Sequence, residues 1–189
     1  MILLVCTANQ CRSPLAAAAL RMRLAHRDPA VIVESAGLGA DGFPATPPTV
    51  DAAAILGLDL STHRSRRVDA SLVGRAELVV GMERRHVREV VVLDRRSLPR
   101  TFTLKELVRR GSEIGSRAPE ESLAAWLERV NTGRRPTDLL GSSRDDDIAD
   151  PTVDPLTDYD VTAREVDDLV RRFVELAFPL RAGAEPARS

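Results

Sequence analysis

The sequence lacks the features that send a protein into or across a membrane. No apolar run approaches the length of about 18 residues that a membrane-spanning helix needs, and no charged segment precedes the short apolar run at residues 1–5. We therefore expect neither a transmembrane helix nor a signal peptide, and we predict a cytoplasmic protein with no membrane partner.

An excess of positive charge is also missing. The chain carries 27 Lys and Arg against 28 Asp and Glu, for a formal net charge of −1. A general nucleic-acid binder has at least one strongly basic face. We therefore expect no nucleic-acid partner, and instead a small-molecule or protein substrate.

Cysteines and aromatic residues are scarce. The two cysteines, Cys6 and Cys11, are too few for a disulfide framework, so they indicate either chemistry or packing. Aromatic residues make up 3% of the chain, with one Trp and one Tyr, which leaves little material for an aromatic binding wall. The sequence calls for no metal and no cofactor, and it predicts no particular oligomeric state.

Short apolar runs alternate with helical patterns along the chain. Strands are expected at 2–6, 30–35, 77–80 and 100–103, and helices at 14–25, 49–56, 83–92, 104–110, 119–130 and 161–177. This alternation predicts an α/β fold with an open, mostly parallel four-stranded sheet and helices on both faces. At 189 residues the chain fits one domain, expected at 1–181 and followed by a flexible tail at 182–189.

The segment "VCTANQCRSP" connects the first strand to the first helix, where loops of open parallel sheets bind anions. Arg12 can hold two oxygens of a phosphate-like group, and the amides of residues 7–12 can surround it. Such a positive setting favours a thiolate at Cys6, to which Ser13 can donate a hydrogen bond. On position and spacing alone, another interpretation is equally consistent, with Cys6 buried in the strand, Arg12 a surface charge and Cys11 a core residue.

This loop resembles the signature of the low-molecular-weight protein tyrosine phosphatases, which is cysteine, five residues, arginine and serine at the N-terminus. The resemblance continues through "VESAGLGADGFPATP" at 33–47, "LGLDLSTHRSRR" at 56–67, "ELVVGM" at 77–82 and "IADPTVDP" at 148–155. It covers residues 1–92 and 148–177, whereas residues 95–145 match poorly and are expected to be divergent or to bear an insertion.

The resemblance implies a role for each residue of the loop. Cys6 is implied as the nucleophile that forms a phosphocysteine, Arg12 as the group that binds the phosphoryl oxygens, and Asp150 as the acid that protonates the leaving oxygen. The implied substrate-binding residues are Thr7, Ala8, Asn9, Gln10, Cys11 and Arg12. The implied supporting residues are Ser13, Asn9, Ser35 and His63, of which Asn9 tolerates a left-handed backbone.

Three sets of carboxylates compete for the acid role. We favour Asp150 because the apolar residues before it promote a protonated carboxyl through desolvation, whereas residues 145–147 read as a solvated charge run. Asp154 is the alternative acid, and its structural interpretation is a turn or cap before the last helix. The Arg-rich stretch 84–110 and the Asp-rich stretch 145–168 are interpreted as solvated helix faces that form opposite patches, with a docking surface for an acidic partner as the alternative.

The resemblance implies a phosphorylated protein or small phosphate ester as substrate, with phosphotyrosine first. Phe43 and Thr152 stand where the family has its aromatic wall, and the polar Gln10 would face the leaving group. Protein-arginine phosphatase activity, arsenate reduction with an external thiol, and non-catalytic phosphate binding therefore stay as alternatives. For Cys11, the family suggests a reversible disulfide with Cys6, and a passive core residue is the alternative.

Overall fold

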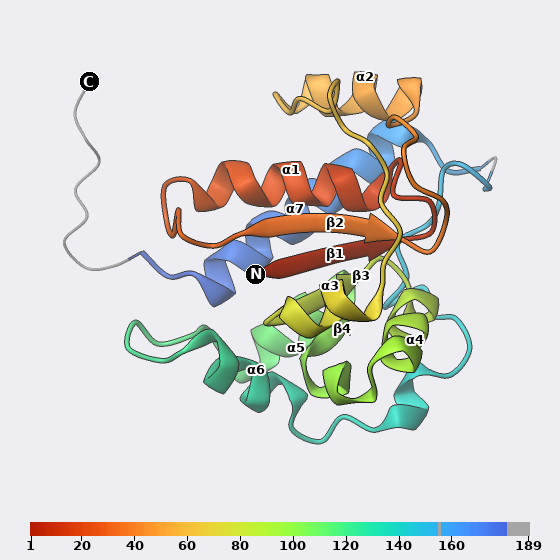
Figure 1. The fold of residues 1–189 in the computed structure, drawn as a ribbon. Helices are drawn as coiled ribbons and strands as arrows, with labels where there is room; N and C mark the ends of the chain where they lie inside the picture. Colours follow the sequence, from red (N-terminus) through yellow and green to blue (C-terminus); the bar gives the residue numbers. More distant parts are fainter. Residues whose placement is uncertain (155, 181–189) are drawn as a thin grey trace, which may run out of the picture.

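The computed structural model describes residues 1–154 and 156–180. Its strands are β1 (Ile2–Cys6), β2 (Val33–Gly37), β3 (Leu78–Gly81) and β4 (Thr101–Thr103). They form one sheet in the order β2-β1-β3-β4, and every pairing is parallel (Figure 1). The predicted α/β fold is confirmed, and the sheet is entirely rather than mostly parallel.

Seven α-helices within the described residues connect and cover these strands. They are α1 (Arg12–Leu24), α2 (Pro47–Ile55), α3 (Ala70–Arg75), α4 (Arg84–Leu93), α5 (Leu104–Ile114), α6 (Leu123–Asn131) and α7 (Tyr159–Ala177). Two 3₁₀ helices lie at Arg95–Arg100 and Pro136–Leu139. Helices therefore occupy most of the positions that the sequence pattern predicts.

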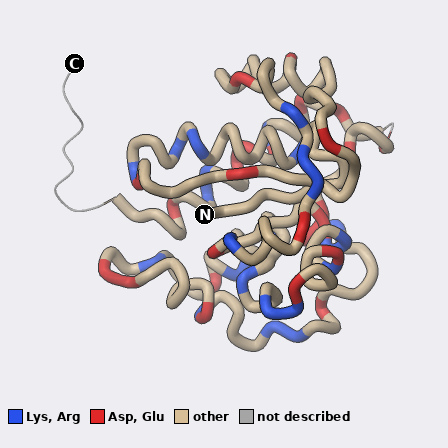
Figure 2. The backbone as a smooth tube through the Cα atoms, in the orientation of Figure 1, with Lys and Arg blue, Asp and Glu red and all other residues tan. Residues whose placement is uncertain are grey.

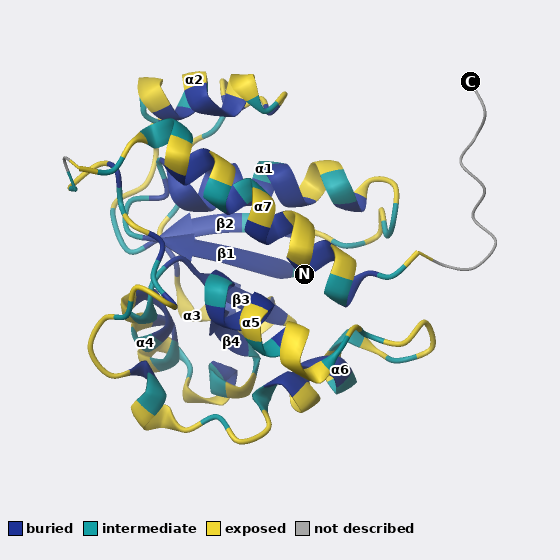
Figure 3. Cartoon of the chain, turned by 180° about the vertical axis from the view of Figure 1, so that it is seen from behind, coloured by how far each residue is buried: buried dark blue, intermediate teal, exposed yellow. Residues whose placement is uncertain are grey.

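Two hydrophobic clusters, one on each face of the sheet, form the core. Alternate side chains of β1 enter different clusters, as expected for an extended strand: Leu4 packs with residues of α1, α5 and α7, and Leu3 packs with α3 and α4. Figure 3 shows the sheet almost entirely buried, with helices that are buried toward it and exposed away from it. The prediction of helices on both faces is confirmed.

The structure corrects several predicted boundaries. The second strand begins at Val33 and runs to Gly37, because the Val31 N–H closes a turn onto the Asp28 carbonyl in the segment after α1. Helix α3 was not predicted, since its six residues are too short to show a clear period. Helix α6 begins only after Ser122, whose hydroxyl accepts a hydrogen bond from the Ala125 N–H and caps it. The predicted tail at 182–189 lies outside the described residues.

Parallel pairing brings the carboxyl ends of all four strands to one edge of the sheet. The chain leaves β1 toward β2 on one side and later returns to β3 on the other, so a crevice opens between the ends of β1 and β3. The predicted anion-binding loop follows β1 at this crevice. No helix of the described residues is both long and apolar enough to span a bilayer.

Candidate active site

The loop between β1 and α1 is packed against the end of β2. The Thr7 carbonyl accepts hydrogen bonds from the N–H groups of Leu38 and Gly39, at 2.7 Å and 2.9 Å. A Cβ at Gly37 would lie 2.6 Å from the backbone nitrogen of Asn9 and 2.8 Å from the Thr7 oxygen. Only glycine allows this approach, so the end of β2 fixes the loop from below.

Cys6 ends β1 with its sulfur beneath the loop. Its Sγ accepts a hydrogen bond from the Asn9 N–H at 3.2 Å, and the Ser13 hydroxyl lies 3.0 Å from it. The single Ser13 hydrogen is shared with the Ala36 carbonyl at 3.2 Å. Donors aimed at sulfur stabilise a negative charge there, which is what a nucleophilic thiolate needs.

Asn9 organises the loop. It has φ +55°, the one positive φ outside glycine among the described residues, and it is fully buried. Its side-chain amide donates to the hydroxyls of Ser13 and Ser35, both at 2.9 Å, and its Oδ1 accepts from the Arg66 N–H. The Asn9 carbonyl accepts from His63 Nε2 at 2.6 Å. The structure thus brings together all four predicted supporting residues.

His63 is therefore a donor in this network, which requires a hydrogen on Nε2. Burial lowers the pKa of His63, against the opposing effect of its bond to the Asn9 carbonyl. A neutral imidazole that donates through Nε2 satisfies both conditions.

Several backbone amides of the loop are unused. Within residues 1–154 and 156–180, the N–H groups of Ala8, Gln10, Cys11 and Arg12 donate no hydrogen bond. Arg12 also begins α1, whose first turn contains no acidic residue, so the positive end of the helix dipole faces the same place. Free amides and a helix N-terminus together make a setting for an anion.

The Arg12 side chain is 1% exposed and lies between two carboxylates. Its Nη1 donates to Glu83 Oε1 at 2.5 Å and to the Ile148 carbonyl at 2.8 Å. Its Nη2 donates to Asp150 Oδ2 at 2.5 Å and lies 3.3 Å from the Thr7 hydroxyl. The four hydrogens of the terminal nitrogens are thereby engaged, and only Nε–H has no partner within the described part of the chain.

The two candidate acids differ in their surroundings. Asp150 pairs with Arg12 beside the loop, and its Oδ1 accepts from the backbone and hydroxyl of Thr152. Asp154 instead accepts from the Leu156 N–H and the Thr157 hydroxyl, as a turn residue does. Of these two carboxylates, only Asp150 contacts Arg12.

A cavity of about 580 Å³ opens beside the loop. Four carboxylates and two guanidiniums line it, from Glu83, Asp147, Asp150, Asp154, Arg85 and Arg144. None of the described residues that line it is aromatic, and Phe43 is 51% exposed elsewhere. No three His, Cys, Asp or Glu side chains group as metal ligands within the described ranges.

A family model for low molecular weight phosphotyrosine protein phosphatases matches residues 1–130. The chain belongs to this family. The probable low molecular weight protein-tyrosine-phosphatase EpsP of Ralstonia nicotianae is 46% identical over 90 residues, which make up 47% of this chain. The chain spans only 59% of the length of that relative.

Solved structures share the fold over 92% of this chain. The low molecular weight protein tyrosine phosphatase from T. tengcongensis is 27% identical, with a TM-score of 0.67 over 92% of this chain and 97% of that one. The YwlE arginine phosphatase from Geobacillus stearothermophilus is 28% identical, with a TM-score of 0.66 over 92% of this chain and 90% of that one.

In this member of the low molecular weight phosphatase family, two further residues reach the site, and neither was predicted. They are Glu83, the N-cap of α4, and His86, within α4. Glu83 pairs with Arg12, and its N–H donates to His86 Nδ1 at 3.0 Å. His86 Nε2 therefore carries the hydrogen and donates to the Thr7 hydroxyl at 3.1 Å. The available signal was position, because Glu83 follows β3 at the sheet edge where β1 also ends.

His86 is fully buried. Burial, reinforced by the charges of Arg12 and Arg85, lowers its pKa to about 3. Its imidazole is neutral at physiological pH and serves as a fixed donor to the loop. Arg85, next to it, also donates to the Thr7 hydroxyl at 2.8 Å.

Cys11 is buried at the start of α1, and both cysteines are free. Burial raises the pKa of Cys11 to about 11, although a hydrogen bond with Thr49 opposes the shift. Its sulfur is a thiol at neutral pH. A disulfide with Cys6 stays a prediction.

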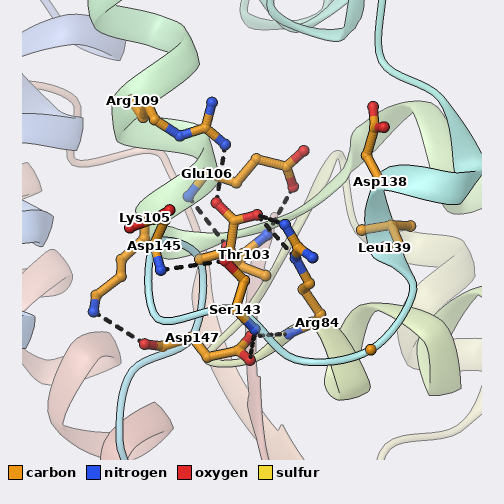
Figure 4. A network of polar contacts seen from close by, with 12 residues as sticks. Arg84, Thr103, Lys105, Glu106, Arg109, Asp138, Leu139, Ser143, Asp145 and Asp147 are labelled. Atoms are coloured by element: carbon orange, nitrogen blue, oxygen red, sulfur yellow. Dashed lines mark hydrogen bonds and ion pairs between the residues drawn. The ribbon is translucent and has the colours of Figure 1, made fainter.

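The predicted solvated charge run is wrong at Asp146, which is 4% exposed. Burial raises its pKa, but hydrogen bonds from Arg109 and Arg84 outweigh this effect, and the pKa of Asp146 lies below its ordinary value. Figure 4 shows Arg84 and Arg109 converging from α4 and α5 on this segment.

Arg84 and Arg109 of the Arg-rich stretch therefore pair with Asp146 of the Asp-rich stretch. Lys105 adds a further pair with Glu165. Figure 2 shows basic and acidic residues interspersed over the described chain. Local charge runs did not reveal this pairing because it joins residues 37 to 62 positions apart.

Proposed function

We propose that this protein hydrolyses phosphate monoesters, with protein phosphotyrosine as the first candidate, through a phosphocysteine intermediate. One observation carries the proposal: the hydrogen-bonded sulfur of Cys6 lies under a loop of free amides, and this loop leads into Arg12, which is paired with Asp150. Membership of the phosphatase family and the names of the relatives support it.

The first step transfers the phosphoryl group to sulfur. The Cys6 thiolate attacks phosphorus, the bond from phosphorus to the ester oxygen breaks, and Asp150 gives its proton to that oxygen. The loop amides and Arg12 hold the equatorial oxygens, where charge accumulates. In the second step Asp150 takes a proton from water, the water oxygen bonds to phosphorus, and the thiolate leaves with the Ser13 hydroxyl as its donor.

Substrate binding also frees the acid. A phosphate held by two Arg12 nitrogens takes the unused Nε–H and one terminal N–H, and Nη2 is shared by Thr7 and Asp150. The dianion thus competes with Asp150 for Arg12. Release from Arg12 lets Asp150 turn toward the leaving oxygen while Glu83 keeps its hold on Nη1.

A protein-arginine phosphatase is the second candidate, and the composition of the cavity favours it. Carboxylates outnumber guanidiniums there and no described lining residue is aromatic. Such a wall suits a cationic guanidinium leaving group better than a tyrosine ring. Solved neighbours named as YwlE arginine phosphatases add support.

One experiment tests the reaction and separates the two candidates. The wild type and Cys6→Ser are compared on matched peptides that carry phosphotyrosine, phosphoarginine or phosphoserine. We expect turnover on phosphotyrosine or phosphoarginine and a loss of roughly 10⁴-fold or more in Cys6→Ser. Equal rates in both proteins would contradict the mechanism. Phosphate binding without turnover would support the non-catalytic alternative. Reduction of arsenate with a thiol donor would support the arsenate reductase alternative.

The remaining predictions concern the setting of this chemistry. We propose a cytoplasmic protein whose single domain spans residues 1–181, with residues 95–145 as its divergent part. Phosphorylated proteins or small phosphate esters are its proposed partners, with no metal or cofactor in the reaction.

A further inference from the structure

The segment that delivers Asp150 to the loop has little regular structure of its own. Between the end of α6 and Asp150 it contains one 3₁₀ helix, Pro136–Leu139. Leu139 and Ile148 are its buried apolar side chains. Polar contacts to α4 and α5 supply most of the remaining attachments of this segment.

Asp146 makes the most concentrated of these attachments. Its Oδ2 accepts from Arg84 Nε and Nη2 at 3.0 Å and 2.7 Å, and its Oδ1 accepts from Arg109 Nη2 at 2.9 Å. Charge-assisted hydrogen bonds of this kind are strong and directional. One nearly buried carboxylate therefore ties the segment to the first residue of α4 and to the middle of α5.

The residues after Asp146 continue directly to the catalytic groups. Asp147 accepts from the backbone N–H of Arg84 at 2.7 Å. Ile148 donates to the Met82 carbonyl at 2.8 Å, and its own carbonyl accepts from Arg12. Four positions separate Asp146 from Asp150, so a shift at the ion pair moves the acid with few intervening degrees of freedom.

We propose that Asp146 is a positioning residue for the acid: through Arg84 and Arg109 it holds residues 147–150 so that Asp150 meets Arg12 and the leaving oxygen. The inference rests on the proposed function. Asp146 does not contact the phosphate-binding loop. Its loss should therefore affect proton transfer to the leaving oxygen and leave phosphate binding unchanged.

Asp145 provides a matched control. It carries the same charge one position earlier, is exposed, and its carboxylate accepts no hydrogen bond within the described residues. Asp145→Asn and Asp146→Asn thus change the net charge equally. Only the second removes an ion pair.

The experiment measures kcat/KM for phenyl phosphate and p-nitrophenyl phosphate in the wild type and both variants. Phenolate is the poorer leaving group and depends more on the acid. We expect Asp146→Asn to lower kcat/KM about 10-fold or more on phenyl phosphate and less than about 3-fold on p-nitrophenyl phosphate, with Asp145→Asn near wild type. The inhibition constant of inorganic phosphate should stay within about 2-fold, because the loop is untouched.

Arg109→Gln guards against a variant that fails to fold, because it leaves the pair between Arg84 and Asp146 in place. It should show the same preference for the good leaving group with a smaller loss on phenyl phosphate. Equal losses on both substrates, or weaker phosphate inhibition, would mean a general structural role and overturn the inference.

The wild type separates this inference from the function on which it rests. If it hydrolyses both esters and Asp146→Asn matches Asp145→Asn, the inference alone fails. If it hydrolyses neither ester, the proposed function fails and takes the inference with it.

Discussion

The two halves of the site are held in different ways. The loop after β1 is fixed mainly by hydrogen bonds among uncharged groups around Asn9 and by close contact with Gly37, and Arg85 adds a charged donor to Thr7. The acid segment is held by ion pairs to distant elements, through Asp146 and through Asp150 itself. The nucleophile therefore lies in a rigid frame, whereas the acid lies on a segment whose main partners are charges.

This difference separates phosphate binding from proton transfer. Ion pairs exchange partners readily when a new anion enters, as a substrate phosphate does at Arg12. Buried hydrogen bonds among neutral groups have no such competitor, because their donors and acceptors are already matched. A substitution in the acid segment should therefore leave phosphate binding by the loop measurable, and a substitution in the loop should leave proton transfer by the acid segment measurable.

The largest effect should come from the acid itself. Asp150→Asn should lower kcat/KM for phenyl phosphate by roughly 10²–10⁴-fold, because the leaving oxygen then departs without a proton. Asp154→Asn, on the same segment, should stay near wild type. Steady-state kinetics and phosphate inhibition check this, and a loss in Asp154→Asn alone would mean that the acid is Asp154.

The next largest effect should come from a substitution that disturbs the loop after β1, the other half of the site. Gly37→Ala places a Cβ 2.6 Å from the Asn9 nitrogen, so the loop must shift. Activity on every substrate should fall by about 10²-fold, since misplacement of a reacting group by about 1 Å costs that much. In Gly39→Ala the new Cβ meets its nearest atom at 3.5 Å, an ordinary contact, so activity should persist. Equal behaviour of the two variants would contradict the tight packing.

The smallest effect concerns His86, which donates from α4 to the Thr7 hydroxyl of the loop. Unfolded histidine binds a proton below pH 6.5 or so, whereas burial keeps His86 neutral down to about 3. The unfolded state thus binds more protons in this range, and the stability associated with a neutral His86 is lost as pH falls.

The measurement is urea unfolding of the wild type and His86→Gln at pH 7 and pH 5. The stability advantage of the wild type should shrink by about 2 kcal/mol between these values, at about 1.4 kcal/mol per pH unit below the unfolded pKa. The stability advantage of the wild type over His63→Gln should also shrink from pH 7 to pH 5, because the pKa of His63 is lowered too. A constant difference would contradict a neutral His86.

Local sequence patterns predicted well the strand and helix that flank the loop after β1. The apolar run of β1 and the position of Pro14 place the strand and helix that flank Cys6 and Arg12. The left-handed Asn9 follows from its side chain, which tolerates that backbone. These features depend on residues close together in the chain.

Other contacts escaped prediction because they depend on strand order. Glu83 meets Arg12 only because β3 pairs beside β1, 71 positions away in sequence. Asp146 looked solvated in a run of three acidic residues, and it is buried because α4 and α5 each direct an arginine to the same point. Periodicity and composition contain neither fact.

By itself, the sequence determined an α/β chain whose first strand ends in a cysteine six positions before an arginine, since strand and helix patterns are short-range. Tertiary structure alone decided that Arg12 is paired with Glu83 and Asp150 rather than exposed, and that Asp154 turns away. The physical reason is that ion pairs form between whichever elements the parallel sheet brings to one edge, and that order is set by the packing of the whole chain.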